Sequence, residues 1–333
     1  MDVLAGLLDG PRARGAFLIR SVFDPPWSVR IEDRAPLTLV SMVRGDGWVL
    51  PDRGEPRRLR PGDVAIVRGP EPYTVADDPL TPPQAVIHPG ERSTTPAGDE
   101  LCEVMDLGVR TWGEHLDGAA VLLSGTYQLE GEVSGRLLRV LPPLLVLPHE
   151  AWDSPLVGLL AQEMTRDEPG QEVVLDRLLD LLLIAVLRAW FSRPEAAAPA
   201  WYRAHGDPVV GEALRLLHDR PEQPWTVADL ATRTGMSRAA LARRFTDLVG
   251  EPPMAYLTNL RLALAADLLR EPDATIAAVA RRVGYGSPFA LSSAFKRVHG
   301  LTPTQHRVSP HTAPSPASSA SSASSASPAS PSI

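Results

Sequence analysis

A helical unit occurs twice in the last third of the chain, and this repeat limits what that part can fold into. The first copy reads SRAALARRFTDLVGEPPM from Ser237, and the second reads SPFALSSAFKRVHGLTPT from Ser287. Five positions agree at one offset, namely Ser237, Leu241, Phe245, Gly250 and Pro253 with Ser287, Leu291, Phe295, Gly300 and Pro303. Two copies are too few for a solenoid, so we expect two small helical units with a function of their own.

Each copy predicts two helices joined by a tight turn. Gly235 marks the turn in the first copy and Gly284 marks it in the second. Ser237 is expected to cap the second helix, because a serine hydroxyl accepts a hydrogen bond from a free N–H of the first turn. A Leu and a Phe four residues apart give that helix an inward face, which leaves a basic face outside in the first copy. This is the helix-turn-helix pattern, whose second helix enters the DNA major groove.

The charge distribution sets this region apart from the rest of the chain. The whole sequence has 33 Lys and Arg against 40 Asp and Glu, a net charge of −7, whereas residues 208–308 have 13 against 9, a net charge of +4. A positive domain in a negative chain indicates an anionic partner for that domain alone. Between the copies, residues 253–271 are long enough for one helix. Such a helix would hold the second helices of both copies in successive major grooves of DNA, which are about 34 Å apart. We expect residues 208–308 to bind double-stranded DNA without the rest of the chain.

The upstream half differs from this region in composition and in the pattern of its apolar residues. Residues 1–150 are rich in Pro and Gly and contain short apolar runs that predict strands, at 37–43, 47–50, 63–67 and 137–147. Residues 151–192 change to helical spacing and predict a helical hairpin, broken at DEPGQE. The apolar content of this hairpin exceeds what one buried face needs, which favours packing on the barrel or on a second subunit. We expect the hairpin to form a homodimer.

Two further segments predict little regular structure. Residues 193–207 are expected to form a linker, because their Pro and Gly exclude a long helix. Residues 309–333 consist mainly of Ser, Ala and Pro, with no large apolar side chain before the final Ile333, so we expect a disordered tail.

Cysteine and hydropathy point to the cytoplasm. Cys102 is the only cysteine, which excludes a disulfide within the chain. The N-terminus lacks the basic and apolar regions of a secretion signal. The longest apolar run, 178–187, is too short for a bilayer, which needs about 20 residues. We expect a cytoplasmic protein with no membrane partner.

The stretches WTVADLATRTGMSRAALARRF, GEPPMAYL, RLALAADLLRE and TIAAVARRVGYGSPFALSSAFKRVHGLTPTQHR resemble the DNA-binding domain of the AraC/XylS family of bacterial transcription regulators. Upstream, RPGDVAIV, SGTYQLEGEVSGRLLRVLPPLLVLP and AWFSRPEAAAPAWY are similar to the AraC-binding-like cupin domain of one branch of that family. The resemblance implies a multidomain α and β protein. It would have an N-terminal cupin-like β-barrel with a helical hairpin, and a C-terminal all-α domain with two helix-turn-helix motifs.

The resemblance also implies which residues contact DNA. Base contacts in the family come from the exposed face of each second helix. In this chain that face is Arg238, Ala239, Ala242 and Arg243, then Pro288, Phe289, Ser292 and Ser293, with Lys296 at its edge. We expect Arg243 to be the main base reader, because a guanidinium can bridge guanine O6 and N7.

The two copies are not expected to read DNA equally. Arg238 and Lys296 lie near the edges of the face and are expected to contact phosphates. The family usually has Arg where this chain has Ser293, and Phe where it has Leu291. The second helix is therefore expected to read bases poorly, while Phe289 is a candidate for contact with a thymine methyl or for packing.

The upstream domain reads as a sensor and not as an enzyme. Cupin enzymes hold a metal with clustered His and Glu on adjoining strands, but residues 37–75 contain no His and Tyr73 stands where a late one is expected. The histidines His88, His115 and His149 are isolated in sequence. We therefore expect neither a catalytic metal nor a cofactor, and instead a small-molecule effector inside the barrel.

Several points stay open at the level of sequence. The side chains that either line the barrel or simply form its core are Trp27, Met42, Trp48 and Tyr73. Thiol oxidation at Cys102 is an alternative way of sensing, although no second cysteine is present to resolve a sulfenic acid. A cupin enzyme fused to a DNA-binding module is a further alternative, and RNA polymerase is a candidate partner of the main interpretation.

Overall fold

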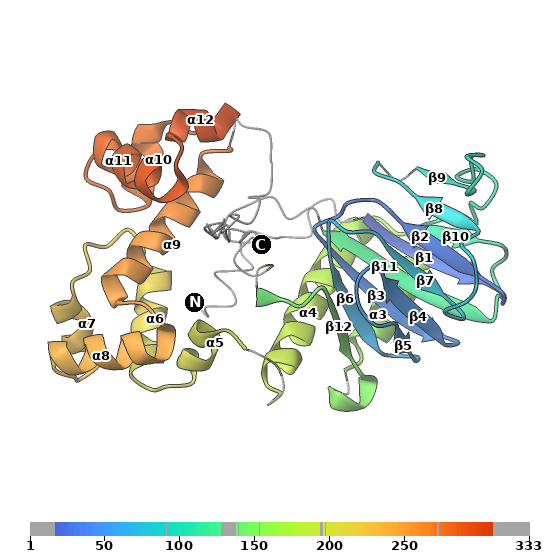
Figure 1. Ribbon diagram of the computed structural model, residues 1–333, viewed down its shortest axis with the longest axis horizontal. Coiled ribbons are helices and arrows are strands. Elements are labelled where there is room, and N and C mark those ends of the chain that lie inside the picture. Colours follow the sequence, from blue (N-terminus) through green and yellow to red (C-terminus); the bar gives the residue numbers. More distant parts are fainter. Residues whose placement is uncertain are drawn as a thin grey trace, which may run out of the picture.

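The structure is a computed structural model that describes residues 17–90, 92–127, 138, 140–152, 154–193, 196, 198–271 and 273–308. The N-terminal part is β-rich, and a helical part follows it along the chain (Figure 1). Within these ranges, none of the helices combines the length and the hydropathy that a bilayer crossing requires. The predicted tail 309–333 lies outside the described residues.

Two six-stranded sheets form the N-terminal domain. The first has the order β10-β1-β11-β3-β6-β12, with β10 Thr111–Gly113, β1 Phe17–Phe23, β11 Ala120–Tyr127, β3 Leu37–Arg44, β6 Val64–Arg68 and β12 Leu144–Leu147. The second has the order β5-β4-β7-β2-β8-β9, with β5 Arg57–Leu59, β4 Gly47–Pro51, β7 Tyr73–Ala76, β2 Ser28–Ile31, β8 Ala85–Ile87 and β9 Ser93–Thr94.

Strand β3 shows why the first sheet has two cores. All of its residues from Leu37 to Met42 are buried, although successive side chains point to opposite faces. Val40 and Met42 join the core between the two sheets, whereas Leu37 and Leu39 join the core under the helices. A strand covered on both faces is expected to be continuously apolar and not alternating.

The strands expected at 37–43, 47–50 and 63–67 are confirmed as β3, β4 and β6. Of the run 137–147, only Leu144–Leu147 is a described strand.

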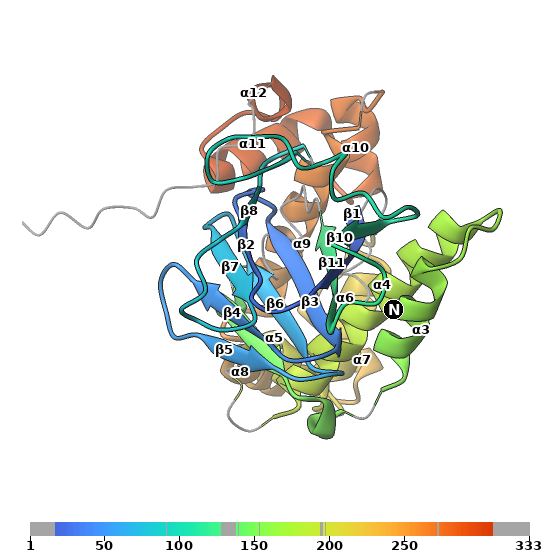
Figure 2. The same ribbon diagram turned by 90° about the vertical axis from the view of Figure 1, so that its right-hand side faces the viewer.

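Helices α3 (Leu156–Met164) and α4 (Gln171–Phe191) occupy the region of the expected hairpin and lie beside the first sheet (Figure 2). Gly125 on β11 allows the close approach, because a Cβ there would stand 2.7 Å from Leu179 Cδ1. The buried Tyr127 hydroxyl donates a hydrogen bond to the Leu179 carbonyl oxygen at 2.7 Å. These contacts fix α4 on the outer face of the sheet.

The helical part contains α5 to α12. Their bounds are α5 Ala200–His205, α6 Val210–Asp219, α7 Val227–Arg233, α8 Arg238–Val249, α9 Pro253–Leu268, α10 Ile276–Arg282, α11 Pro288–His299 and α12 Pro303–Val308. Helix α9 contributes to two separate cores. Leu257 and Leu260 belong to the core of Phe245, whereas Leu262 and Ala265 belong to the core of Phe295. In Figure 1, α9 accordingly runs from the α6–α8 unit to the α10–α12 unit.

The segment 193–207 differs from the expected linker. It contains α5, whose Ala204 is buried in the first helical core. The short helix is compatible with the Pro and Gly around it because it begins after Pro199 and ends before Gly206. Its burial depends on residues far along the chain, so local sequence alone did not indicate it. The folded helical unit therefore begins near residue 199 and not at 208.

Candidate nucleic-acid interface

The second helix of each repeat, α8 and α11, is held by the interactions that the sequence predicts. Ser237 Oγ accepts a hydrogen bond from the Ala240 N–H at 3.2 Å, and Ser287 Oγ accepts one from the Ala290 N–H at 3.1 Å. The Leu and Phe of each copy are fully buried, as expected for Leu241, Phe245, Leu291 and Phe295. Both helices are thus fixed by a cap and by an apolar inner face.

The outer face of α8 carries two arginines that are available to a partner. Arg238, Ala239 and Arg243 are exposed, whereas Ala242 is half-buried. Within the described part of the chain, Arg238 and Arg243 form no ion pair and no side-chain hydrogen bond. Their guanidinium groups can therefore meet a nucleic acid without breaking an existing contact.

Arg244 differs from its neighbour Arg243, and no local sequence signal marks the difference. Its guanidinium pairs with the carboxylate of Asp207, with Nη2 and Oδ2 2.5 Å apart. Hydrogen bonds from Arg244 hold the pKa of Asp207 below its ordinary value, so the pair stays charged in neutral solution. One arginine of the Arg243-Arg244 pair thus ties α8 to the end of α5, and the other is free.

The outer face of α11 is less basic. Pro288, Phe289, Ser293 and Lys296 are exposed, and Ser292 is half-buried. The Phe289 side chain is 80% exposed, so it does not serve the core of this domain. Its exposure favours the contact alternative over packing within the chain.

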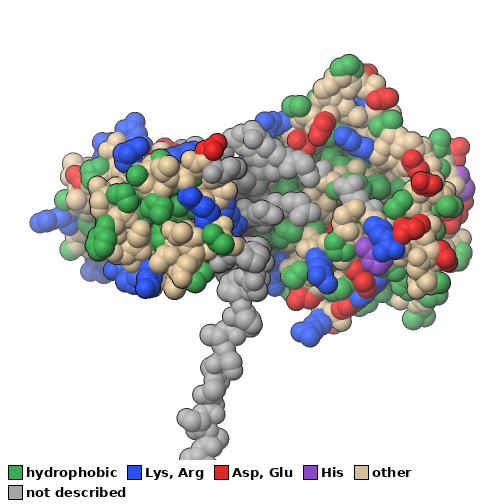
Figure 3. Space-filling model, turned by 90° about the horizontal axis from the view of Figure 1, so that it is seen from above, with side chains coloured by type: hydrophobic (Ala, Val, Ile, Leu, Met, Phe, Trp, Pro, Cys, Tyr) green, Lys and Arg blue, Asp and Glu red, His purple; other side chains and the backbone are tan. Residues whose placement is uncertain are grey.

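Basic groups gather over the helical part of the molecule. In the space-filling view of Figure 3, the left-hand body shows mostly Lys and Arg among its charged side chains, whereas the right-hand body mixes both signs. This agrees with the opposite net charges of the two regions of the sequence. The electrostatic attraction for an anionic polymer therefore belongs to the helical domain.

Comparisons with known proteins agree with this geometry. The cupin family matches residues 2–192, and the helix-turn-helix domain family matches residues 230–309. An AraC-like transcription regulator of Streptomyces lividans is 33% identical over 93% of this chain and 99% of its own length. The chain belongs to the AraC-type transcription regulators.

Two further proteins are similar to parts of this regulator. The transcriptional regulator AlkR of Acinetobacter baylyi is 37% identical over 51% of this chain and 58% of its own length. A solved AraC-type DNA-binding domain from Chromobacterium violaceum is 31% identical over 31% of this chain and 93% of that one, with a TM-score of 0.30. The expectation of a DNA-binding AraC-type regulator with a cupin domain is confirmed.

The cupin domain of the regulator contains a cavity of about 390 Å³ between its two sheets. The first sheet lines it partly with hydroxyl groups, from Ser21, Thr38, Ser124 and Thr126. The second sheet lines it with aliphatic side chains, from Val29, Ile31, Val75 and Ile87. Hydroxyl groups on the inner face of a sheet are unusual for a plain core. They make this wall of the cavity partly polar, beside apolar side chains such as Ile19 and Leu122.

The structure shows which of the four candidate lining residues, three aromatic and one Met, line the cavity and which do not. Tyr73 lines the cavity, and burial raises the pKa of its hydroxyl well above the ordinary value. Met42 belongs to the core between the sheets, and Trp48 does not line the cavity. Trp27 also belongs to that core and borders a neighbouring pocket. Asp33 and Arg110, which the sequence analysis missed, line the cavity, and no local sequence signal marks them.

His115 is less isolated than the sequence indicates. Its Nε2 lies 2.6 Å from Asp24 Oδ2, and Glu114 Oε2 accepts a hydrogen bond from the Asp24 N–H at 3.3 Å. The other oxygen of Asp24 accepts the Ala119 N–H at 2.7 Å, which is the main cause of the lowered pKa of Asp24. These exposed contacts fasten the loop after β10 to the end of β1.

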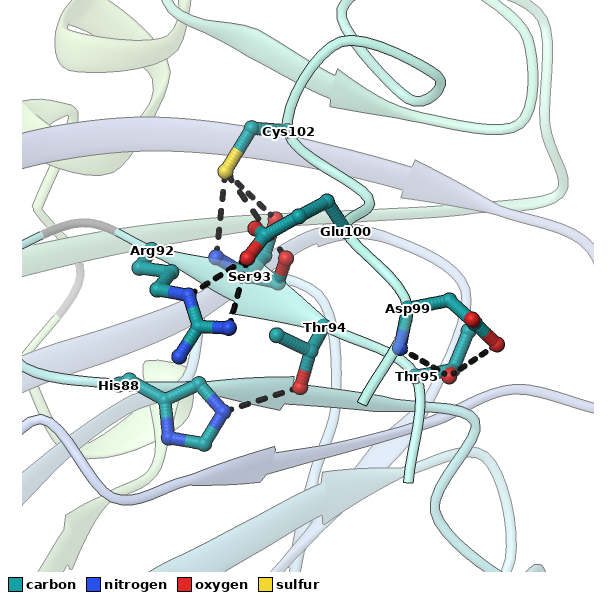
Figure 4. Close-up of polar contacts among 8 residues, drawn as sticks. All are labelled: His88, Arg92, Ser93, Thr94, Thr95, Asp99, Glu100 and Cys102. Carbon is teal, nitrogen blue, oxygen red and sulfur yellow. Dashed lines mark hydrogen bonds and ion pairs between the residues drawn. The ribbon is translucent and has the colours of Figure 1, made fainter. Parts of the chain in front are cut away.

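Cys102 also lines the cavity, on the loop that follows β9. Its Sγ accepts a hydrogen bond from the Ser93 N–H at 3.2 Å and lies 3.2 Å from the Ser93 hydroxyl (Figure 4). Ser93 lines the same cavity. Thiol sensing stays a prediction, and the thiol stands beside whatever the cavity holds.

Proposed function

We propose that this regulator binds promoter DNA as a homodimer and that a small molecule in the N-terminal cavity controls it. The observation that carries the proposal is the pair of capped helices, α8 and α11, whose outer faces carry the exposed basic groups Arg238, Arg243 and Lys296. Arg243 reads a guanine, and the other two contact phosphates. The chain acts in the cytoplasm and is not an enzyme. A relative similar over 93% of this chain is named as a transcription regulator, which supports this.

The helical unit is expected to bind DNA without the cupin domain. Because Ala204 and Asp207 belong to this unit, the fragment to test is 199–308. Its affinity for duplex DNA should fall as salt rises, with a slope of log K against log salt near −0.9 for each neutralised phosphate. Fluorescence anisotropy over a salt series measures this slope. Absence of binding, or binding insensitive to salt, would contradict the proposal.

The dimer is supported by an apolar stripe on α4 that stays partly exposed. The stripe consists of Val174, Leu178, Leu181 and Ala185, spaced alternately four and three residues apart. Each of these side chains is exposed or half-buried, and Leu181 is 49% exposed. Spacing of this kind places apolar side chains along one seam, as in two helices that pack together.

Full-length protein is therefore expected to sediment as a dimer at micromolar concentration, and Leu181→Lys is expected to sediment as a monomer. A charge in the centre of an apolar seam costs desolvation energy that the dimer cannot recover. Val173→Lys is the matched control, because Val173 is 61% exposed but lies off the stripe. A wild-type monomer, or an equal effect of both substitutions, would remove the support for this interface.

A path of contacts joins the sensor to the DNA-binding unit. Phe191, the last residue of α4, packs its ring against Trp201 and Tyr202 of α5, with centroid distances of 6.5 and 4.9 Å. The chain after α5 reaches α8 through the Asp207–Arg244 ion pair. A shift of α4 on effector binding would thus be transmitted through α5 and would move α8, the helix proposed to read DNA. This supports control by the N-terminal cavity.

A further inference from the structure

Arg110 places a positive charge without a close partner on the cavity of the cupin domain. Its Nε is buried and has no hydrogen-bond partner. The described residues offer its guanidinium no ion pair, and the carboxylate of Asp176 on α4 acts on it only at longer range. The backbone of Arg110 also has a φ of 47°, a left-handed conformation that costs free energy for a side chain other than glycine. The left-handed backbone and the unpaired buried Nε both cost free energy. An anionic or strongly accepting group in the cavity would offset part of that cost by pairing with the guanidinium.

Asp33 places an unsatisfied negative charge on the same cavity. Its Oδ1 accepts a hydrogen bond from the Ala35 N–H at 3.0 Å, and no Lys, Arg or His in the described ranges pairs with it. Burial raises the pKa of this carboxyl group by more than its backbone hydrogen bonds lower it, so the surrounding protein compensates its charge only in part.

The two charges do not neutralise each other. Asp33 follows β2 in the second sheet, whereas Arg110 precedes β10 in the first sheet, and no ion pair joins them. Between them the lining combines hydroxyl groups with aliphatic and aromatic side chains. A further lining carboxylate, Asp106, is exposed and accepts a hydrogen bond from the Gly108 N–H. Partly buried charges without partners are unfavourable, and a molecule with complementary charges would relieve both at once.

We propose that the cavity binds an amphipathic zwitterion, a molecule with one acidic group and one basic group on an apolar body. The acidic group pairs with Arg110, the basic group pairs with Asp33, and the body packs against aliphatic side chains such as Ile31 and Val75. A molecule with a single acidic group would leave Asp33 without a partner, and a simple amine would leave Arg110 without one. This inference rests on the proposed sensing function and names the class of its effector.

Two sets of matched probes test the inference on the full-length protein. In one set, phenylalanine is compared with phenylpropionate and phenylethylamine, each of which lacks one charged group. In the other, para-(aminomethyl)phenylacetate, with its charges at opposite ends of a ring, is compared with para-methylphenylacetate and para-methylbenzylamine. Calorimetry at millimolar probe measures affinity. At least one zwitterion should bind about 10- to 100-fold more tightly than either of its singly charged analogues.

Two substitutions test which cavity residue binds which charged group of the zwitterion. Arg110→Gln should reduce the affinity for the zwitterion to that for the matching amine, and Asp33→Asn should reduce it to that for the matching acid. Matched controls are Arg58→Gln and Asp46→Asn, because these residues form an exposed ion pair outside the cavity lining. Circular dichroism without probe establishes that each variant is folded, and a variant that is not is replaced by Arg110→Lys or Asp33→Glu. These should change the preferred zwitterion within a set.

Three results would overturn the inference. They are no binding of either zwitterion, equal affinity of a zwitterion and a singly charged analogue, and insensitivity of zwitterion binding to both cavity substitutions. DNA binding by the same preparations is measured separately. Loss of the zwitterion preference with intact DNA binding rejects this inference alone, whereas zwitterion binding without DNA binding rejects the proposed function alone.

Discussion

Replacing Arg243 with alanine is expected to weaken binding to the preferred DNA site by about 1 to 3 kcal/mol, or about 5- to 150-fold. The reason is that Arg243 is exposed on α8, and within the described part of the chain its side chain forms no hydrogen bond or ion pair that it would have to give up. Discrimination should be lost at one base pair only. Binding to a library of duplexes with single-base changes measures both effects.

Three comparisons make this test specific. Arg244→Ala removes the same charge from the neighbouring position, but that guanidinium is paired with Asp207, so base discrimination should remain. Ser293→Ala on α11 should have little effect, because a hydroxyl both donates and accepts and therefore selects poorly among bases. Ser293→Arg should sharpen the preference at the second half-site. Discrimination that survives Arg243→Ala would show that α8 reads DNA with another face.

Replacing Gly284 with alanine is expected to destabilise the helical unit by about 2 to 5 kcal/mol. Gly284 has a φ of +80°, and a Cβ there would stand 2.4 Å from the backbone oxygen of Glu222. Left-handed strain and a clash with backbone both contribute, and the backbone cannot rotate away as a side chain can. Urea unfolding of the fragment 199–308 measures the change in the free energy of unfolding.

The equivalent glycine of the first repeat supplies the control. Gly235 has a φ of +69°, but a Cβ there would meet nothing within 4 Å. Gly235→Ala should therefore cost only the conformational strain, about 1 to 2 kcal/mol. Equal costs at the two positions would mean that the contact with Glu222 relaxes freely.

The helix-turn-helix units could be predicted because their determinants are local. A serine cap, a turn glycine and a Leu-Phe pair lie within a dozen residues in each copy, and all of them take the expected roles. The strands β3, β4 and β6 were equally accessible from short apolar runs bounded by turns.

The cavity and α5 could not be predicted because they depend on contacts between distant residues. Arg110 reaches the cavity through the parallel pairing of β10 with β1, in which Thr111 stands opposite Arg20. No sequence feature near Arg110 predicts the pairing of β10 with β1. Ala204 is buried for the same reason, by helices that follow it in the chain. The helical domain that reads DNA was therefore visible in the sequence, whereas the residues that would recognise an effector were not.

Helix α9 has a consequence for the DNA sites that the regulator can accept. Since Leu260 and Leu262 join different cores, a single rigid rod sets the angle between the two readers, with about 1.5 Å of travel and 100° of rotation per residue. Under the proposed function, in which α8 and α11 both enter the major groove, one residue more or less in α9 would turn α11 out of alignment with α8 on the DNA. The length of α9 thus sets the distance between the two DNA half-sites. A promoter must match both that distance and the rotation of one half-site relative to the other around the DNA axis.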